Sequence, residues 1–377
     1  MVFNAFLAIG IILLLLYVIQ ILYYALALQG KHLKRETSES GSRLHISLII
    51  PVRNEINNLA NLLSDLEDQD YPKDLFEVIF IDDHSSDGST VFLKEACSSK
   101  KNFKFLTLDA RSKGKKTALH HGITHARGEW IIQTDADCRI PSAYITLHAS
   151  KASERDTLMI AGPVLISANA SLWTKLEALE YLSLTATAMA SFKRQRPVMC
   201  SGANLSYNKD FYFSIADQLL ESPTPSGDDV FMMLQAKKRE KPVSYLHDAK
   251  AIVFTRSSGS LRAFLQQRIR WGSKSRIVKD GDILRLSFLV LLTNINLTIL
   301  LILSLFTHGT IYYFLFFLLV KSMADLMLLL PASGILKQNS LLGYFPLGAI
   351  FYYFYVSIAG LFSLSGKYRW KDRKFKM

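Results

Sequence analysis

The sequence predicts an α/β domain with a mainly parallel sheet. Transmembrane helices are predicted before and after this domain in the chain. Two observations lead to this prediction. Between residues 44 and 137, short apolar runs alternate with amphipathic stretches, which is the pattern of strands joined by helical crossovers. Before and after the central domain, the chain contains apolar runs of membrane-spanning length, with few charges or none.

The N-terminal apolar run extends from Phe3 to Leu28 and contains no charged side chain. About 20 apolar residues are enough to cross a bilayer as a helix, and no basic residues precede the run as they would in a cleavable signal peptide. The basic cluster at 31–35 follows it, so this end is expected to be cytoplasmic. Residues 1–30 are therefore predicted to be a membrane anchor, and residues 31–43 a flexible linker.

Three further apolar runs follow the central domain, at 286–306, 311–330 and 341–364, and each is long enough to span a bilayer. Lys321 and Asp325 lie inside the second run at helical i, i+4 spacing, and we interpret them as a self-neutralised pair. The predicted organisation after the linker has three parts. They are a central domain at 44–258, an amphipathic interface segment at 259–285, and membrane segments with a basic tail at 286–377.

The net charge of +12 indicates an anionic partner. The basic residues gather beside apolar segments, at 31–35, 262–276 and 367–376, which favours an anionic membrane surface over nucleic acid. We therefore expect Arg262, Arg268 and Arg276 to lie at the membrane interface. The three cysteines are far apart and odd in number, so they indicate neither a disulfide framework nor a metal cluster.

Polar side chains follow three predicted strands of the central domain. They are Arg53, Asn54 and Glu55 after "HISLIIPV", Asp82 and Asp83 at the end of "FEVIFIDD", and Asp135 and Asp137 at the end of "GEWIIQTDAD". Ligands bind beyond the carboxyl ends of parallel strands. Two adjacent carboxylates raise each other's cost of ionisation. We therefore predict a divalent metal carrying phosphate oxygens between Asp135 and Asp137.

Six motifs in this order resemble membrane-bound family-2 glycosyltransferases with the GT-A fold. They are "SLIIPVRNE", "VIFIDDHSSDGS", "KGKKTALHHGITHARGEWIIQTDAD", "SGANLSYNKDFY", "GDDVFMMLQ" and "QQRIRW". The resemblance covers Ser47 to Trp271. A lone D-x-D carries little information, but the ordered set that ends in Q-x-x-R-W is specific. It is typical of cellulose-, chitin- and hyaluronan-synthase-like enzymes and of ceramide glucosyltransferases.

The resemblance implies a GT-A (Rossmann-like) sheet with helices on both faces, and Mg²⁺ or Mn²⁺ held by Asp135 and Asp137. It also implies a nucleotide-sugar donor, which the strand ends and the Q-x-x-R-W segment contact. The residues that match these contacts are Pro51, Arg53, Glu55, Asp82, Asp83, Lys115, Asp135, Gln267 and Arg270.

The acceptor hydroxyl needs a carboxylate that takes its proton during attack. The resemblance places this base at Asp229, while the Gly227-Asp228 departure from the usual triplet leaves Asp228 open. Acceptor contacts fall on Gly202, Asn204 and Trp271. One base without a second nucleophilic carboxylate implies direct displacement, with inversion at the sugar carbon.

These observations predict an inverting, metal-dependent glycosyltransferase that is integral to the membrane, with its catalytic domain in the cytosol. The expected donor is a nucleotide-diphosphate sugar, with UDP-sugars favoured, and the expected acceptor is a lipid or lipid-linked compound of the cell envelope, or a glycan. The alternative is a processive polysaccharide synthase that also exports its polymer. A catalytically silent membrane scaffold is disfavoured, because every acidic position of the motifs is retained.

Overall fold

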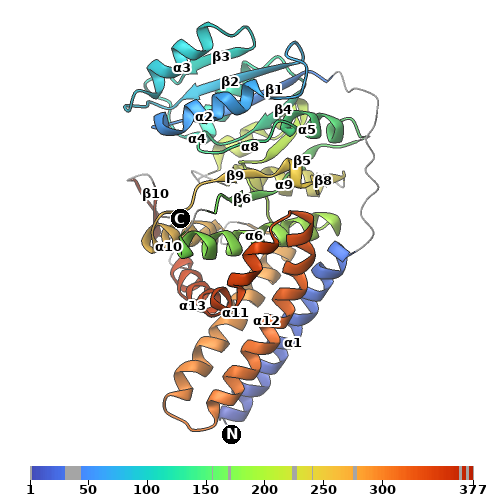
Figure 1. Cartoon of the computed structure of the whole chain (residues 1–377), viewed down its shortest axis with the longest axis vertical. Helices are drawn as coiled ribbons and strands as arrows, with labels where there is room; N and C mark the ends of the chain where they lie inside the picture. Colours follow the sequence, from blue (N-terminus) through green and yellow to red (C-terminus); the bar gives the residue numbers. More distant parts are fainter. Residues whose placement is uncertain are drawn as a thin grey trace. The chain divides into compact units, whose positions relative to one another are not determined.

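The computed structural model describes residues 2–29, 44–154, 156–168, 171–222, 227–239, 241–274, 278–364, 367–370 and 373–376. The predicted linker at 31–43 and the predicted interface residue Arg276 lie outside these ranges. The chain forms two compact units (Figure 1). We call Lys31–Ser167 with Gln195–Arg256 the sheet unit, and Met1–Gly30, Ala168–Arg194 and Ser257–Met377 the helical unit.

The main sheet of the sheet unit contains seven described strands in the order β3-β2-β1-β4-β7-β5-β8. Pairing is parallel from β3 to β4 and between β5 and β8, whereas β7 is antiparallel to both its neighbours. The strands are β1 (Ile46–Val52), β2 (Phe76–Asp82), β3 (Phe103–Thr107), β4 (Trp130–Gln133), β5 (Met159–Ala161), β7 (Leu205–Asn208) and β8 (Val243–Tyr245). A second, parallel pair joins β6 (Val164–Ile166) to β9 (Val253–Thr255).

The central strands consist of near-continuous apolar runs because parallel strands are covered on both faces. All seven residues of β2 and all four of β4 are buried. The covering helices are α2 (Ile56–Glu67), α3 (Ser89–Ser98), α4 (Lys115–Thr124) and α5 (Tyr144–Ala152). The strands and helices predicted for residues 45–137 are therefore confirmed.

The strand order reverses direction next to β1. The crossovers through α2 and α3 add strands on one side of β1, and the crossover through α4 adds β4 on the other side. Right-handed crossovers in opposite directions place their helices on opposite faces of the sheet. The carboxyl ends of β1 and β4 therefore meet at a topological switch point, where α/β sheets bind ligands.

The rest of the sheet unit consists of short helices that follow β7. They are α7 (Lys209–Phe213), α8 (Ala216–Glu221), α9 (Asp228–Lys238) and the 3₁₀ helix η1 (Ala249–Ala251).

The helical unit is built from six long helices within its described residues. They are α1 (Val2–Gln29), α6 (Leu172–Lys193), α10 (Leu261–Ser273), α11 (Gly281–Ser304), α12 (Thr310–Ile335) and α13 (Phe345–Ser363). Figure 1 shows α1, α11 and α12 side by side, and α10 packs on α13. The 3₁₀ helix η3 (Asn339–Tyr344) precedes α13, and a hairpin of β10 (Lys367–Trp370) and β11 (Arg373–Lys376) follows it.

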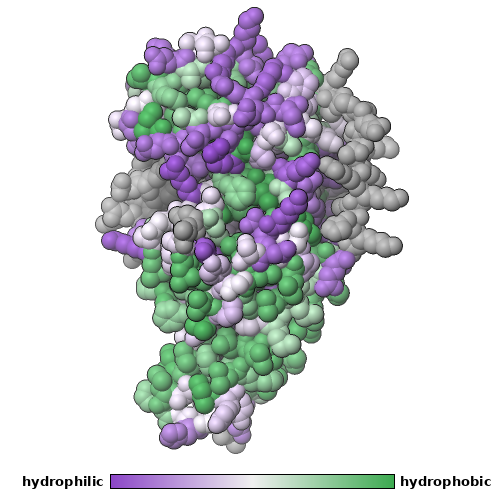
Figure 2. Space-filling model, viewed as in Figure 1, coloured by the Kyte–Doolittle hydropathy of each residue, from purple (hydrophilic) through white to green (hydrophobic). Residues whose placement is uncertain are grey.

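The described residues include four helices that are long and apolar enough to cross a membrane: α1, α11, α12 and, together with η3, α13. Figure 2 shows hydrophobic residues over the outer surface of the lower part of the molecule. Ile9, Leu15, Phe316 and Leu319 of these helices are all at least half exposed. Outward-facing apolar side chains of this kind are expected where lipid is the solvent. The four runs predicted as spans are thus apolar helices, which supports membrane association.

Two details differ from the sequence prediction. Helix α6 lies inside the predicted central domain at 44–258, but the structure groups it with the helical unit, where it packs on α1, α12 and α13. Helix α12 also continues past Pro331, where the sequence predicts a join. Proline removes one backbone donor, but packing holds the following turn, in which Ala332 and Ser333 are fully buried.

Candidate active site

Two loops at the carboxyl edge of the sheet are tied together by side-chain to backbone hydrogen bonds. Asn54, which has a positive φ of 56°, follows β1, and its Oδ1 accepts the backbone N–H of Ser86 at 2.8 Å. Asp87 accepts the N–H of Ile56 at 3.0 Å, so the loop after β2 also caps α2. These polar residues thus form a fixed rim at the ends of β1 and β2.

The two acids at the end of β2, Asp82 and Asp83, have different hydrogen-bond partners. Asp82 accepts the hydroxyl of Thr90 at 3.0 Å and the N–H of Ser85 at 3.2 Å, so its carboxylate shapes its own loop. Asp83 Oδ2 accepts the N–H of Gly114 at 3.0 Å and lies 3.4 Å from Arg53 Nη1. The buried Oδ1 of Asp83 has no hydrogen-bond partner among the described residues. Asp83 therefore keeps an acceptor oxygen for a ligand N–H or O–H, whereas both oxygens of Asp82 already accept hydrogen bonds.

Asp135 and Asp137 follow β4, as predicted, and both are half-buried. Lys115, the first residue of α4, donates from Nζ to Asp135 Oδ1. Burial, together with the nearby charges of Asp135 and Glu55, raises the pKa of Asp137 to about 6. Burial alone would lower the pKa of Lys115, but Asp135 and then Asp229 and Asp228 raise it above its usual range. The site is therefore a cluster of acids around one lysine.

A divalent cation fits the two acids after β4. After burial itself, the charge of Asp135 is the next cause of the raised pKa of Asp137, and a cation between the two acids would remove this repulsion. Within the described ranges, no group of three or more His, Cys, Asp or Glu side chains is arranged to hold a metal ion. Asp135 and Asp137 would therefore supply two hard oxygen ligands and leave the other positions to phosphate oxygens and water.

Asp228 and Asp229 begin α9, directly after Gly227, whose φ of 109° favours glycine. Asp229 Oδ2 accepts the backbone N–H of Gly202 at 3.2 Å. A Cβ added to Gly202 would lie 2.9 Å from Gln133 Nε2 and 3.7 Å from Lys115 Nζ. Asp229 is therefore next to the acid-lysine cluster, and only a small residue fits at position 202.

Asp228 lies in different surroundings. Its side chain is 8% exposed, and its charge acts on Lys116, Tyr207 and Tyr212. Burial lowers the pKa of Lys116, and Asp228 partly offsets this effect. Asp228 thus balances a buried lysine, whereas Asp229 lies beside Lys115 and Gly202.

The prediction of Asn204 as an acceptor contact is not supported. Its side chain is 0% exposed, and Nδ2 donates to the carbonyls of Pro163 and Ala251, each at 2.9 Å. His148 Nε2 lies 3.0 Å from Asn204 Oδ1, and burial lowers the pKa of His148 to about 4, so this ring is a neutral donor. The amide of Asn204 is therefore a satisfied part of the core.

Gln133 is a site residue that sequence reasoning missed. It lies in the buried end of β4, where Nε2 donates to the carbonyl of Gly202 at 3.1 Å and Oε1 accepts the hydroxyl of Tyr207 at 2.9 Å. An amide in an otherwise apolar buried strand was the available signal, because a buried amide needs partners. Gln133 therefore connects β4, the strand before Asp135 and Asp137, to Gly202, whose N–H binds Asp229.

The Q-x-x-R-W residues Gln267, Arg270 and Trp271 lie on α10 in the helical unit, and each is half-buried. The expectation that Arg268 lies at the membrane interface is wrong. Arg268 is 6% exposed, and its Nε donates to Glu180 Oε1 at 2.9 Å. Although burial opposes its charge, Glu180 raises the pKa of Arg268 above its usual range.

Of the predicted site residues, the sheet unit brings Glu55, Lys115, Asp135, Asp137 and Asp229 into one cluster, with Gly202 beside it. Arg53 and Asp83 contact each other on the rim. Pro51 pairs with Ile81 in the sheet, one residue before β1 ends. The roles of Gln267, Arg270 and Trp271 stay predictions.

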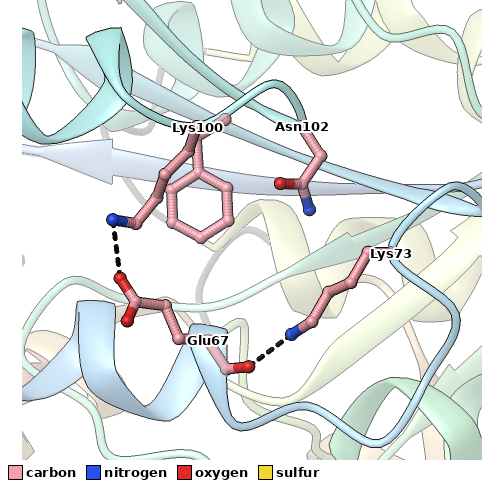
Figure 3. Close-up of a pocket in the computed structure, with 5 residues that line it drawn as sticks. Glu67, Lys73, Lys100 and Asn102 are labelled. Atoms are coloured by element: carbon pink, nitrogen blue, oxygen red, sulfur yellow. Dashed lines mark hydrogen bonds and ion pairs between the residues drawn. The ribbon is translucent and has the colours of Figure 1, made fainter.

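A small pocket lies elsewhere on the sheet unit (Figure 3). Its lining residues come from the end of α2, the loop before β2, and the loop before β3 with the first residue of that strand: Glu67, Lys73, Lys100, Asn102 and Phe103. Lys100 Nζ pairs with Glu67 at 2.7 Å. The pocket is at the amino ends of the strands, away from the carboxyl edge that carries the acids, so it is not part of the candidate active site.

Residues 47–213 match glycosyl transferase family 2. An N-acetylglucosaminyltransferase of Rhizobium meliloti is 27% identical over 257 residues, which cover 66% of this chain and 59% of the relative. A beta-monoglucosyldiacylglycerol synthase of Trichormus variabilis is 29% identical over 148 residues, or 38% of this chain and 31% of the relative. The matched segments thus span about three fifths and one third of these relatives' lengths.

The structure is also similar to that of a mannosyltransferase from Pyrobaculum calidifontis in complex with GDP-Man and Mn²⁺. The TM-score is 0.59 at 16% identity, over 95% of this chain and 97% of the other, which shows a shared fold. The predicted GT-A sheet with flanking apolar helices is therefore confirmed. Residues 47–213 of the chain thus match glycosyl transferase family 2, and the chain has the GT-A fold.

Proposed function

We propose that this chain is a family-2 glycosyltransferase, which transfers a sugar from a nucleotide-diphosphate sugar to a lipid or lipid-linked acceptor at the cytoplasmic face of a membrane, with inversion at the sugar carbon. The observation that carries the proposal is the cluster at the switch point, where Lys115 pairs with Asp135 and Asp229 lies beside Gly202. The cluster brings a candidate site for the diphosphate and metal, at Asp135 and Asp137, next to a candidate base, Asp229, within the sheet unit.

The rim is suited to the nucleotide. Asp83 has a buried acceptor oxygen without a partner among the described residues, so it can accept an N–H from a base or an O–H from a ribose. Asp82 is not proposed as a contact because its carboxylate is used by its own loop. Arg53, which already pairs with Asp83, can extend its donors towards the donor substrate. UDP-sugars are the favoured donors.

Asp135 and Asp137 would hold Mg²⁺ or Mn²⁺, which supplies Lewis-acid stabilisation of the charge on the departing diphosphate. Lys115 contributes a fixed positive charge at the same place, because its raised pKa keeps it protonated at neutral pH. The chain's own cation and acids thus orient the diphosphate.

Asp229 is the proposed base. As the acceptor oxygen forms its bond to the anomeric carbon, the bond from that carbon to the diphosphate oxygen breaks, and the diphosphate leaves with the electron pair. The acceptor proton passes to a carboxylate oxygen of Asp229, which the N–H of Gly202 holds in place. Asp228 is not favoured for this role, because its charge balances the buried Lys116.

A lipid acceptor is favoured by the four apolar helices and by the relative whose name describes a monoglucosyldiacylglycerol product. The N-acetylglucosaminyltransferase relative covers more of the chain and leaves a glycan acceptor as the second candidate. Polysaccharide synthesis with export would additionally need a path through the membrane for the polymer.

The test is to incubate membranes that contain the full chain with a panel of radiolabelled nucleotide sugars, with Mn²⁺, with Mg²⁺ or with a chelator. We expect label in the lipid extract, dependent on the metal. The matched control is Asp137→Asn protein present at the same level. Label in insoluble polymer would establish the synthase alternative. Transfer that survives chelation would contradict the metal assignment, and no transfer or donor hydrolysis from any nucleotide sugar would contradict the enzyme proposal.

A further inference from the structure

Arg268 lies in the interior of the helical unit, although it belongs to a segment whose charges suggest a surface. Its guanidinium donates to both oxygens of Glu180 on α6, at 2.9 Å from Nε to Oε1 and through Nη2 to Oε2. Tyr355 of α13 donates its hydroxyl to the same Oε1 at 2.7 Å. One carboxylate from α6 therefore joins α10 to α13.

The same guanidinium contacts two residues of the Q-x-x-R-W motif. Nη1 of Arg268 donates to Oε1 of Gln267, and the guanidinium carbon lies 4.4 Å from the centre of the Trp271 ring. Tyr181, the neighbour of Glu180, meets Trp271 edge to face with ring centres 5.9 Å apart. Arg268 thus holds the amide of Gln267 by a hydrogen bond and packs against the indole of Trp271.

Stability alone does not account for this arrangement. Burying an ion pair costs desolvation of both charges, and well-packed apolar residues in its place are often as stable or more so. The surroundings of Arg268 are aromatic, with Phe264 at 4.3 Å from its guanidinium carbon, and Phe351 and Tyr355 packed on Phe264. A flat guanidinium with five directed donors does what an apolar residue cannot, because it orients an amide and stacks on an indole simultaneously.

We propose that Arg268 is a positioning residue for sugar transfer, which fixes Gln267 and Trp271 through an anchor formed by Glu180 and Tyr355. Arg268 does not touch the substrates in this proposal and acts through its two neighbours on α10. The inference rests on the proposed function and on the sequence prediction that Gln267 contacts the donor and Trp271 the acceptor. It adds that the acceptor-side geometry depends on helices α6 and α13.

The experiment uses the full chain in detergent and compares Arg268→Lys with Arg262→Lys, an exposed arginine of the same helix. Lysine keeps the charge but loses the fork and the flat stacking face. We expect Arg268→Lys to lower the rate of transfer by about 10- to 100-fold, the scale of a misplaced substrate contact, while metal-dependent nucleotide affinity changes by less than about twofold. Arg262→Lys should leave both unchanged.

A mutant-cycle comparison tests whether Arg268 acts through Gln267 and Trp271. In a background that combines Gln267→Ala with Trp271→Ala, Arg268→Lys should lower transfer by no more than about twofold, because both residues that it positions are already absent. A full additional loss in that background would overturn the proposal and indicate an independent or purely structural role. Because Arg268→Lys could fold poorly, Tyr355→Phe provides a milder change that removes one hydroxyl and keeps the ring in its aromatic cluster.

A spectroscopic readout separates this inference from the proposed function. Subtracting the emission spectrum of Trp271→Phe protein isolates the fluorescence of Trp271. We expect both Arg268→Lys and Tyr355→Phe to shift this component, while Arg262→Lys does not. An unchanged Trp271 component in both variants would overturn the proposal even in a chain that transfers sugar. A shifted component in a chain without transfer would leave the positioning intact and contradict the proposed function instead.

Discussion

Asp228 and Asp229 are neighbours in the chain, but the first turn of α9 directs them to different surroundings. Successive residues of a helix point about 100° apart. Asp229 therefore accepts the N–H of Gly202, while the charge of Asp228 acts on Lys116. The surroundings, rather than the residue type, therefore decide which of them is available as a base.

We expect Asp229→Asn to lower turnover by about 100-fold or more while donor affinity is retained, because the amide keeps the shape but cannot take the acceptor proton. Turnover and donor affinity should be measured in the same detergent preparation. Asp228→Asn is the matched control. If Asp229→Asn loses donor binding while Asp228→Asn loses only turnover, the base is Asp228.

The next prediction concerns metal binding by Asp135 and Asp137, the two carboxylates that follow β4. Asp137→Asn should abolish transfer and weaken nucleotide binding in the presence of Mn²⁺, because the site loses one of two hard oxygen ligands and a charge. Asp135→Asn should do the same and also release Lys115 from its ion pair. Nucleotide binding is measured with and without metal, and Glu95→Gln on the exposed side of α3 is the control. Near-normal turnover of either variant at low metal concentration would contradict the assignment.

At the scale of elements, Glu77 links three strands through one carboxylate. It accepts the hydroxyl of Ser47 on β1 at 2.7 Å and the N–H of Arg127 at 2.5 Å, and it pairs with Lys104 on β3. Burial alone would raise the pKa of Glu77, but the bonds from Lys104, Arg127 and Ser47 lower it below its usual value of 4.5. The parallel strands that position the site are thus held together by an ionised side chain.

Glu77→Gln should therefore destabilise the sheet unit by about 1 to 2 kcal/mol at neutral pH, as expected for a lost charge-assisted hydrogen bond. Since the folded-state pKa is lowered, this contribution is present above the unfolded value of 4.5 and disappears as the pH falls through the folded value. The apparent Tm of both proteins, measured from pH 7 down to pH 3, should therefore converge at acid pH.

The control for this prediction is Glu67→Gln, which removes an exposed ion pair with Lys100. Exposed pairs contribute little, so its Tm should stay within about one or two degrees of the parent. An equal loss of Tm in both variants, or a difference for Glu77→Gln that persists at pH 3, would show that the carboxylate charge is not what links the strands.

At the scale of the whole molecule, the number of membrane crossings sets the location of the C-terminus. Three full crossings by α11, α12 and α13 after a cytoplasmic domain would place the tail outside, yet residues 367–376 carry six Lys or Arg residues and one Asp. Basic segments next to spans favour the cytoplasm. We therefore predict a cytoplasmic tail, with one of the C-terminal helices re-entrant or lying in the interface.

A reporter fused after Met377 tests this prediction, with a reporter in the N-terminal basic segment at 31–35 as the cytoplasmic reference. Both should be protected in intact cells and become accessible when the membrane is permeabilised. Access to the C-terminal reporter from outside intact cells would contradict the prediction and would favour three complete crossings.

Much of this protein is determined by its sequence alone, because the signals concerned are local. The apolar runs are membrane-length helices, the alternation of runs at 45–137 is the parallel sheet, and the acids after β1, β2 and β4 converge because parallel strands end at one edge. Hydrophobic periodicity and strand direction are properties of short segments, so they can be inferred without knowing what those segments contact.

Only the tertiary structure decided which polar residues are exposed to a ligand. Arg268 is buried because Glu180, 88 residues away in the chain, accepts its guanidinium, and Asn204 is buried because Pro163 and Ala251 accept its amide. Asp82 and Asp83 are adjacent acids that only their long-range partners distinguish. A polar side chain is stable in the interior only when partners satisfy it, and these partners come from segments that the fold, not the sequence order, brings together.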